Sequence, residues 1–253
     1  VKYNGCVFGA YIAHFIKEGN EKELNSWLEK FKKEKYTHLK EYESFLTELS
    51  SDYLRNNRNE LVTLLGECGL ENNIINDLIT YQFAKRGLLE DVENQLDVLK
   101  KENSVDAEIY DSLILAQVKN SKIDDALNTL NVLTKESMEI TADAYCDLIR
   151  ICAEEKRDED VQRLLVEMNE SGHDPTRRGA LVSLIDYFAD KKDVEMTKKY
   201  WNIAQSTGAL TNPEHSHKAI ALLAEYSPPQ AYEMFLQLHH NHVIPLEETF
   251  NVL

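Results

Sequence analysis

The chain has 253 residues, 43% of them hydrophobic, so it is long enough and apolar enough to bury a core. It carries 28 Lys and Arg against 44 Asp and Glu, a formal net charge of −16, and so acidic a chain repels nucleic acid and membranes at long range. Only five prolines and nine glycines are present, which favours helices over strands and turns. No run approaches the roughly 20 apolar residues that a membrane span needs.

The charge is uneven along the chain. Residues 1–40 hold eight Lys and five Glu, a balance of +3, so the remainder carries −19. A basic stripe beside an aromatic residue such as Tyr36 suits single-stranded nucleic acid, whereas solvated surface lysines are an equally good interpretation. The lysines near Tyr36 are Lys30, Lys32, Lys33, Lys35 and Lys40.

One short element recurs along the whole chain. The segment 109–114 reads IYDSLI, and thirty-five residues later 144–149 reads AYCDLI. The intervals between successive copies are 33 to 36 residues. The first position of the element is held by Phe8, Tyr42, Ile75, Tyr110, Tyr145, Leu181, Ser216 and Phe250. The last position is held by Ile12, Leu46, Ile79, Ile114, Ile149, Ile185 and Ile220.

A second apolar element follows the first at the same interval. Its members are three or four residues apart, which places them on one face of a helix. Each unit is therefore predicted to be two amphipathic helices of about a dozen residues. The second unit fits least well, because Arg58 takes the first apolar place and only Val62 and Leu65 fit. The other copies are Leu24, Leu28, Phe31; Val92, Leu96, Leu99; Ala126, Leu130, Leu133; Val161, Leu165, Met168; Met196, Tyr200, Ile203; and Ala231, Phe235, Leu238.

The period predicts an all-α fold, an α-solenoid that winds as a right-handed superhelix of about seven helical hairpins. A compact helix bundle is the alternative, but a bundle does not need a constant step. The chain has no initiator Met and starts a further unit at its end, so we expect a fragment of a longer protein in a single repeat array. The approximate repeats are 6–38, 39–72, 73–107, 108–142, 143–178, 179–213 and 214–247, with the start of another at 248–253.

The units resemble the pentatricopeptide repeat (PPR) family. The resemblance rests on the 35-residue length, the Tyr-x-x-Leu-Ile opening, and the tail MNESGHDP at 168–175. The tetratricopeptide repeat, at 34 residues, is the alternative, but its Trp-x-x-Leu-Gly-x-x-Tyr opening is absent. The loose, Leu-rich, acidic units are most similar to metazoan leucine-rich PPR proteins of mitochondria.

This resemblance implies a non-catalytic RNA-binding protein of mitochondria that acts in mRNA stability, processing or translation regulation. Its implied partners are single-stranded mRNA and a small RNA-recognition-motif protein. A protein-interaction scaffold that uses the concave solenoid surface without touching RNA is the alternative. The charge of −16 favours the scaffold, and the family resemblance favours RNA.

The resemblance also implies two base-reading positions in each unit, one two residues after the opening aromatic and one at the end. The pairs are Ala10 with Leu39, Ser44 with Asn72, Asp77 with Ala107, Ser112 with Ala142, Asp147 with Arg178, Ser183 with Pro213, and Lys218 with Glu247. Only Ser44 with Asn72 matches a combination that is usual in the family, and that combination implies recognition of adenine. Ala, Leu and Pro cannot hydrogen-bond a base edge, so base-by-base reading is restricted. The candidate RNA-binding residues are Ser44, Asn72, Asp77, Ser112, Asp147, Arg178, Ser183 and Lys218.

Other chemistry finds little support in the sequence. His239 and His242 have the i, i+3 spacing of metal ligands, but they fall at a predicted helix end where His also favours the helix dipole, so we expect no metal. Gly-rich phosphate loops, nucleophile elbows and His-Glu-x-x-His motifs are absent, so we expect no enzyme, cofactor or small-molecule substrate. Cys6, Cys68, Cys146 and Cys152 form no Cys-x-x-Cys pair and are expected to be buried thiols in a reducing, intracellular compartment.

Overall fold

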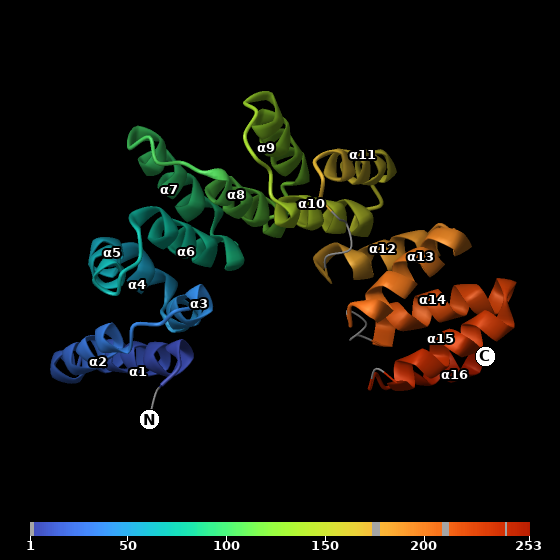
Figure 1. Cartoon of the computed structure of the whole chain (residues 1–253), viewed down its shortest axis with the longest axis horizontal. Coiled ribbons are helices and arrows are strands. Elements are labelled where there is room, and N and C mark those ends of the chain that lie inside the picture. The colour runs from blue at the N-terminus through green and yellow to red at the C-terminus, as the bar shows by residue number, and fades with distance from the viewer. Residues whose placement is uncertain (1–2, 174–177, 209–212, 241) are drawn as a thin grey trace. The chain divides into compact units, whose positions relative to one another are not determined.

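The computed structural model describes residues 3–173, 178–208, 213–240 and 242–253 (Figure 1). Those residues form sixteen helices and no strand, which confirms the predicted all-α fold. They fall into two compact units, residues 1–122 and 123–253. No helix within the described ranges has both the length and the apolar character that a membrane span requires.

Unit 1 consists of helical hairpins stacked side by side. Its helices are α1 (Gly5–Glu18), α2 (Glu21–Glu34), α3 (Leu39–Glu48), α4 (Ser51–Asn56), α5 (Arg58–Glu67), α6 (Asn72–Lys85), α7 (Leu89–Lys101) and α8 (Ala107–Lys119). The first helices of the hairpins, α1, α3, α6 and α8, each pack on the next and form what we call the A row. The second helices, α2, α4–α5 and α7, form the B row.

Unit 2 repeats this arrangement. Its helices are α9 (Ile123–Lys135), α10 (Ala142–Glu154), α11 (Asp158–Glu170), α12 (Arg178–Asp190), α13 (Val194–Ser206), α14 (Pro213–Tyr226), α15 (Pro228–His240) and α16 (Glu247–Asn251). Here α10, α12, α14 and α16 form the A row, in which each packs on the next, and α9, α11, α13 and α15 form the B row.

The core follows the predicted register of the first element, whereas in the second element Leu165 and Phe235 are half-buried and their neighbours Leu164 and Met234 are buried. All seven residues at the last position of the first element are 0% exposed. Leu113 and Leu148, at the neighbouring apolar place, are also buried. One hairpin leaves its apolar face open to water, and stacking against the next hairpin covers it, so the repeat itself builds the core.

The second hairpin departs from this pattern, as its poor fit to the second element indicates. Its B-row helix is broken into α4 and α5 at Asn57, whose backbone leaves the helical region at φ −116° and ψ 24°. The Asn57 amide donates to the carbonyl oxygen of Tyr53 at 3.1 Å, a local bond that competes with the helical ladder. Arg58 then begins α5.

The backbones of α1 and α3 approach closely because glycines line one face of α1. Gly5 and Gly9 are both buried, and a Cβ on Gly9 would lie only 2.6 Å from the carbonyl oxygen of Phe45. The backbone N–H of Gly5 donates to Glu41 Oε2 at 2.7 Å across the same interface. Larger residues at these two positions would force the hairpins apart.

Side-chain bonds also join hairpins at the spacing of one repeat. Asn120 Nδ2 donates to the carbonyl oxygen of Gly87 at 2.8 Å in unit 1, and Trp201 Nε1 donates to Gln237 Oε1 at 2.9 Å in unit 2. The sequence separations are 33 and 36 residues. Bonds of this kind fix the register in which one hairpin stacks on the next.

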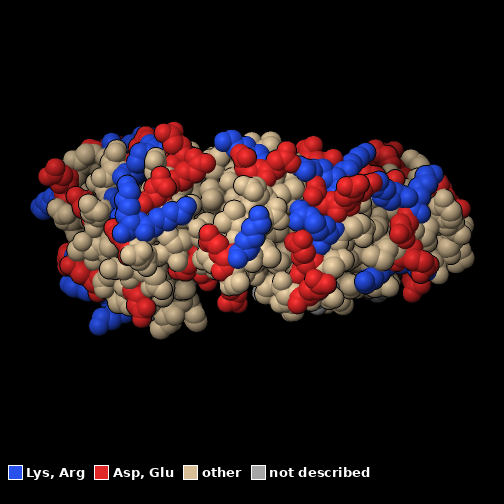
Figure 2. Space-filling model, turned by 90° about the horizontal axis from the view of Figure 1, so that it is seen from above, with Lys and Arg blue, Asp and Glu red and all other residues tan. Residues whose placement is uncertain are grey.

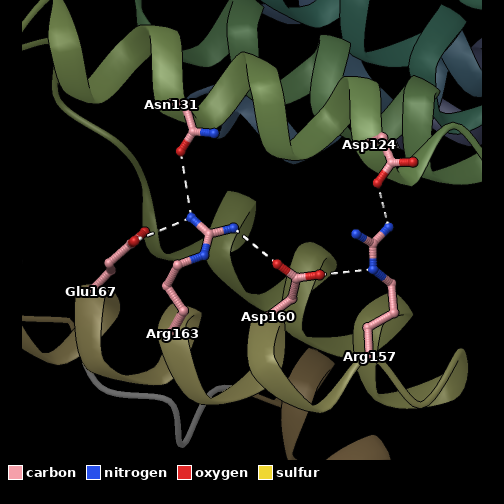
Figure 3. A network of polar contacts seen from close by, with 6 residues as sticks. All are labelled: Asp124, Asn131, Arg157, Asp160, Arg163 and Glu167. Atoms are coloured by element: carbon pink, nitrogen blue, oxygen red, sulfur yellow. Dashed lines mark hydrogen bonds and ion pairs between the residues drawn. The ribbon is translucent and has the colours of Figure 1, made fainter.

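A charged network ties α11 to α9 in unit 2 (Figure 3). Arg157, just before α11, donates to Asp124 at 2.6 Å and to Asp160 at 2.8 Å. Arg163 donates to Asp160 at 3.2 Å and to Glu167 at 3.2 Å, and reaches Asn131 on α9 at 3.4 Å. Because Asp160 is shared by both arginines, the network engages basic groups that a phosphate would otherwise attract.

One prediction about the cysteines is wrong. Cys146 and Cys152 are buried and Cys68 is half-buried, but Cys6 is exposed. The Cys6 thiol donates to Glu48 Oε1 at 3.2 Å, and this bond raises its pKa. Cys6 lies beside Glu48 and off the buried face of α1, which is formed by Gly5, Phe8, Gly9 and Ile12, and this position explains the difference.

Candidate nucleic-acid interface

Both series of implied base-reading positions lie on the A row. The residues that follow the opening aromatic by two lie within A-row helices, from Ala10 in α1 to Lys218 in α14. Each of the seven unit-ending residues is the first residue of an A-row helix. They are Leu39 (α3), Asn72 (α6), Ala107 (α8), Ala142 (α10), Arg178 (α12), Pro213 (α14) and Glu247 (α16). A ligand that runs along the A row within one unit would therefore meet both series.

Ser44 and Asn72 are the one pair with a usual combination. Ser44 is partly exposed, and its hydroxyl donates to the carbonyl oxygen of Lys40 at 2.7 Å, which leaves its lone pairs as acceptors. Asn72 is exposed at the start of α6, where the N-cap residue Glu71 makes no side-chain capping bond. The amide of Asn72 is thus open to a hydrogen-bonding partner.

Asp77 on α6 has an unusual charge state. Burial, and then the nearby carboxylates of Asp106 and Glu108, raise the pKa of Asp77 to about 7. Its Oδ1 atom is buried without a hydrogen-bond partner among the described residues. Near neutral pH this side chain is therefore both a carboxylate and a carboxylic acid, and only the acid can donate to a base.

Two of the other candidates offer little to a ligand. Ser112 is only 3% exposed, so its hydroxyl presents almost no surface. Asp147 is partly exposed, and its Oδ1 lies 3.6 Å from Arg150 Nη2 on the same helix, α10, so its charge is already paired. Ser183 on α12 is partly exposed. The side chain of Arg178, which the sequence places on the base-facing series, lies outside the described residues.

Among the base-reading positions whose side chains the structure describes, Lys218 is the basic one. Its Nζ lies 3.5 Å from Asp190 and 3.8 Å from Asp186, both on α12 of the preceding hairpin. Exposed pairs of this kind contribute little to stability, so a phosphate could replace the carboxylates at small cost. Figure 2 shows a face on which Lys and Arg are interspersed with Asp and Glu, with no continuous basic stripe.

The sequence leaves open which way the aromatic residues of the lysine-rich first hairpin face. Tyr36 turns inward: its hydroxyl donates to the carbonyl oxygen of Tyr3 at 2.6 Å, and its ring packs at 5.7 Å from Phe31. The exposed stack is formed instead by Tyr11 and Trp27, with ring centroids 4.2 Å apart. This pair could not be found from the sequence. Its two residues lie on different helices, and the sequence does not show how those helices are rotated relative to each other.

Lys30 adds charge to that stack. Its Nζ lies 4.5 Å from the centre of the Trp27 ring, and Tyr11 is 45% exposed. Within the described ranges Lys30 makes no ion pair, so its charge remains available to a ligand. The first hairpin thus brings together a stacked pair of aromatic rings and a lysine that makes no ion pair within the described ranges.

No family model and no curated protein matches the chain. Among solved structures it is similar to the crystal structure of the pentatricopeptide repeat protein PPR10 from maize, with 15% identity and a TM-score of 0.50. It also matches PPR10 in complex with an 18-nt psaJ RNA element, with 14% identity, 97% of this chain covered and a TM-score of 0.47.

The likeness covers 99% of this chain but only 36% of the maize chain, so the present chain spans about a third of its length. At this identity the comparison concerns the fold and not the activity. The described chain therefore has a helical-repeat fold like that of the pentatricopeptide repeat proteins.

Proposed function

We propose that this chain is a non-catalytic RNA-binding helical-repeat protein that binds single-stranded RNA along the A row of each unit. The observation that carries the proposal is the placement of both series of implied base-reading positions on A-row helices, one series within them and the other at their starts. The similar fold of the maize protein, which a second crystal structure holds in complex with an 18-nt RNA element, supports it.

Binding is expected to be weak and to show little base preference. Affinity for nucleic acid comes largely from phosphate neutralisation, and for single strands log K falls with log salt at about −0.7 per contact. The base-reading positions carry two cations, Arg178 and Lys218, and several of the other positions carry Ala, Leu or Pro. Few contacts then form, and high affinity depends on further repeats or a partner subunit.

The cellular role follows from the family resemblance. We propose a mitochondrial location and a role in mRNA stability, processing or translation, with a small RNA-recognition-motif protein as partner. The leucine-rich, acidic character of the units supports this assignment.

A protein-interaction scaffold is the second candidate. The net charge of −16 favours it, because so acidic a chain repels an anionic ligand. A partner with a basic surface would then occupy the A row without any RNA.

Filter binding separates the two candidates. The whole chain is titrated against a 20-nt single-stranded RNA and a duplex of the same sequence over a range of salt. Single-strand binding at low salt, with a shallow salt slope, is expected. Arg178→Glu should weaken it and lower the slope by about 0.7, the value of one phosphate contact on a single strand. A chain that binds no RNA at any salt concentration would refute the proposal and leave the scaffold.

A further inference from the structure

Arg58 occupies a place that is apolar in every other unit. The equivalent residues, such as Val92, Ala126 and Val161, are 0% exposed and form part of the core. An arginine at such a place breaks the local rule for a repeat, and such departures are expected at functional sites. In this hairpin the break at Asn57 makes Arg58 the first residue of α5 instead of an interior one.

The guanidinium of Arg58 is only partly satisfied. Its Nη2 donates to Asn76 Oδ1 at 2.7 Å, and Asn76 is itself only 7% exposed. The Nε atom is buried and has no hydrogen-bond partner among the described residues. A buried donor without an acceptor is costly, so the geometry is that of a group held ready for a ligand.

Arg58 borders a polar cavity of about 540 Å³, which we call the asparagine pocket. The pocket opens at the start of α6, whose first backbone N–H groups have no side-chain cap. Those N–H groups and the positive end of the helix dipole both favour an anion. The lining includes Asn72, Asn73, Asn76, Glu102 and Ser104.

A second cavity, of about 330 Å³, lies against Arg58 as well. It is lined by two carboxylates, Glu90 and Asp91, and by Arg55, whose guanidinium is already paired with Asp91 at 2.7 Å, so the added cation is engaged and Glu90 disfavours an anion there. The asparagine pocket has a single carboxylate, Glu102, and several amide groups that both donate and accept. An anion that also carries hydroxyl or amino donors fits the asparagine pocket better than a bare anion does.

We propose that the asparagine pocket binds a nucleotide, with its phosphate on Arg58 and the start of α6 and its sugar or base donors facing Glu102 and the amides. The volume is within the range of small-molecule sites. Where the nucleotide belongs to an RNA strand, the inference rests on the proposed function; a free nucleotide is the other source of the same chemistry.

Calorimetric titration of the whole chain with adenosine 5′-monophosphate, adenosine and an eight-residue oligoadenylate tests the proposal. We expect the monophosphate to bind at least tenfold more tightly than adenosine, since adenosine lacks the phosphate. Arg58→Leu should abolish that difference, and it should fold, because it restores the apolar residue type of the other units. Lys22→Gln removes one exposed charge elsewhere and should leave binding unchanged.

If Arg58→Leu does not fold, Asn73→Asp serves in its place, since an acidic residue suits the first turn of α6 and repels phosphate. Equal binding of the monophosphate and adenosine, or equal binding by the wild type and the variant, would overturn the inference. Oligoadenylate binding that survives Arg58→Leu while the monophosphate never binds overturns the pocket and leaves the RNA proposal standing. Monophosphate binding that depends on Arg58, without oligoadenylate binding, supports the pocket and counts against the RNA proposal.

Discussion

The guanidinium of Arg86 donates from Nη2 to the carbonyl oxygen of Leu46 at 3.1 Å, across forty residues of sequence. Leu46 lies in the last turn of α3, where carbonyl groups have no partner within their own helix. Nη2 also donates to the carbonyl oxygen of Thr47 at 3.1 Å, and Nη1 donates to Ser51 Oγ at 3.2 Å. One side chain from the third hairpin thus completes the end of a helix in the second.

Arg86→Ala is expected to lower the free energy of unfolding by about 1–3 kcal/mol, because it removes hydrogen bonds to the Leu46 and Thr47 carbonyl oxygens and to Ser51 Oγ, while the Leu46 oxygen keeps the backbone N–H of Leu49 as a donor. Lys85→Ala is the matched control, since it removes an exposed ion pair with Glu43 and a contact with the exposed Tyr81 ring, and should cost less than about 1 kcal/mol. Urea unfolding of both variants checks this. Equal losses would mean that Arg86 does not cap α3.

Leu148→Ala should lower the free energy of unfolding by about 2–5 kcal/mol, because Leu148 is fully buried and its truncation leaves a cavity. Val166→Ala is the control: Val166 is 55% exposed on α11, so the loss should be small. Thermal unfolding followed by circular dichroism measures both. A negligible shift for Leu148→Ala would show that the repeat register is misassigned.

Gly9→Ala should destabilise the chain by about 1–3 kcal/mol, because the new methyl group meets the backbone of α3. Gly66→Ala, in helix α5, places its methyl group where no atom lies within 4 Å and should stabilise by about 0.5–1 kcal/mol. Because the two substitutions are expected to change stability in opposite directions, a general effect of replacing glycine by alanine cannot explain both results. Stabilisation by both substitutions would exclude the close approach of α1 and α3.

Asp77 gives the chain a specific pH dependence. Its pKa rises from an ordinary value of 3.8 to about 7 in the folded state, so the folded chain binds more protons than the unfolded one between these values. The stability that the protonated form contributes is complete below about pH 4 and is lost as pH rises through 7.

Asp77→Asn should therefore flatten the decline in stability between pH 5 and pH 8, and should be more stable than the wild type at pH 8. Asp97→Asn is the control, because Asp97 is exposed on α7. Urea midpoints at the two pH values provide the measurement. An unchanged pH profile in Asp77→Asn would show that Asp77 titrates like an ordinary carboxyl group.

The sequence predicts the helices well because the repeat supplies many copies of one pattern. The buried residues at the last position of the first element share one register, and a periodic pattern over several units averages out local exceptions. The break at Asn57 is less predictable. It depends on a side-chain bond to Tyr53 that competes with the helix, and no periodicity encodes such a bond.

The candidate site is predictable only in part. The period places the implied base-reading positions on one row of helices, but it does not state which of their side chains are engaged by neighbours. Lys218 meets Asp186 and Asp190 from the preceding hairpin, and Ser112 is covered. These contacts depend on how hairpins stack, as does the inward turn of Tyr36.

Ultraviolet crosslinking of the whole chain to a 4-thiouridine-labelled single-stranded RNA, followed by mass spectrometry of the crosslinked peptides, tests RNA contact along the A row most directly. The account predicts that the crosslinked residues lie in A-row helices, particularly at the starts of α6 and α12, where Asn72 and Arg178 stand. Crosslinks confined to B-row helices such as α7 and α11, or their complete absence at low salt, would contradict it.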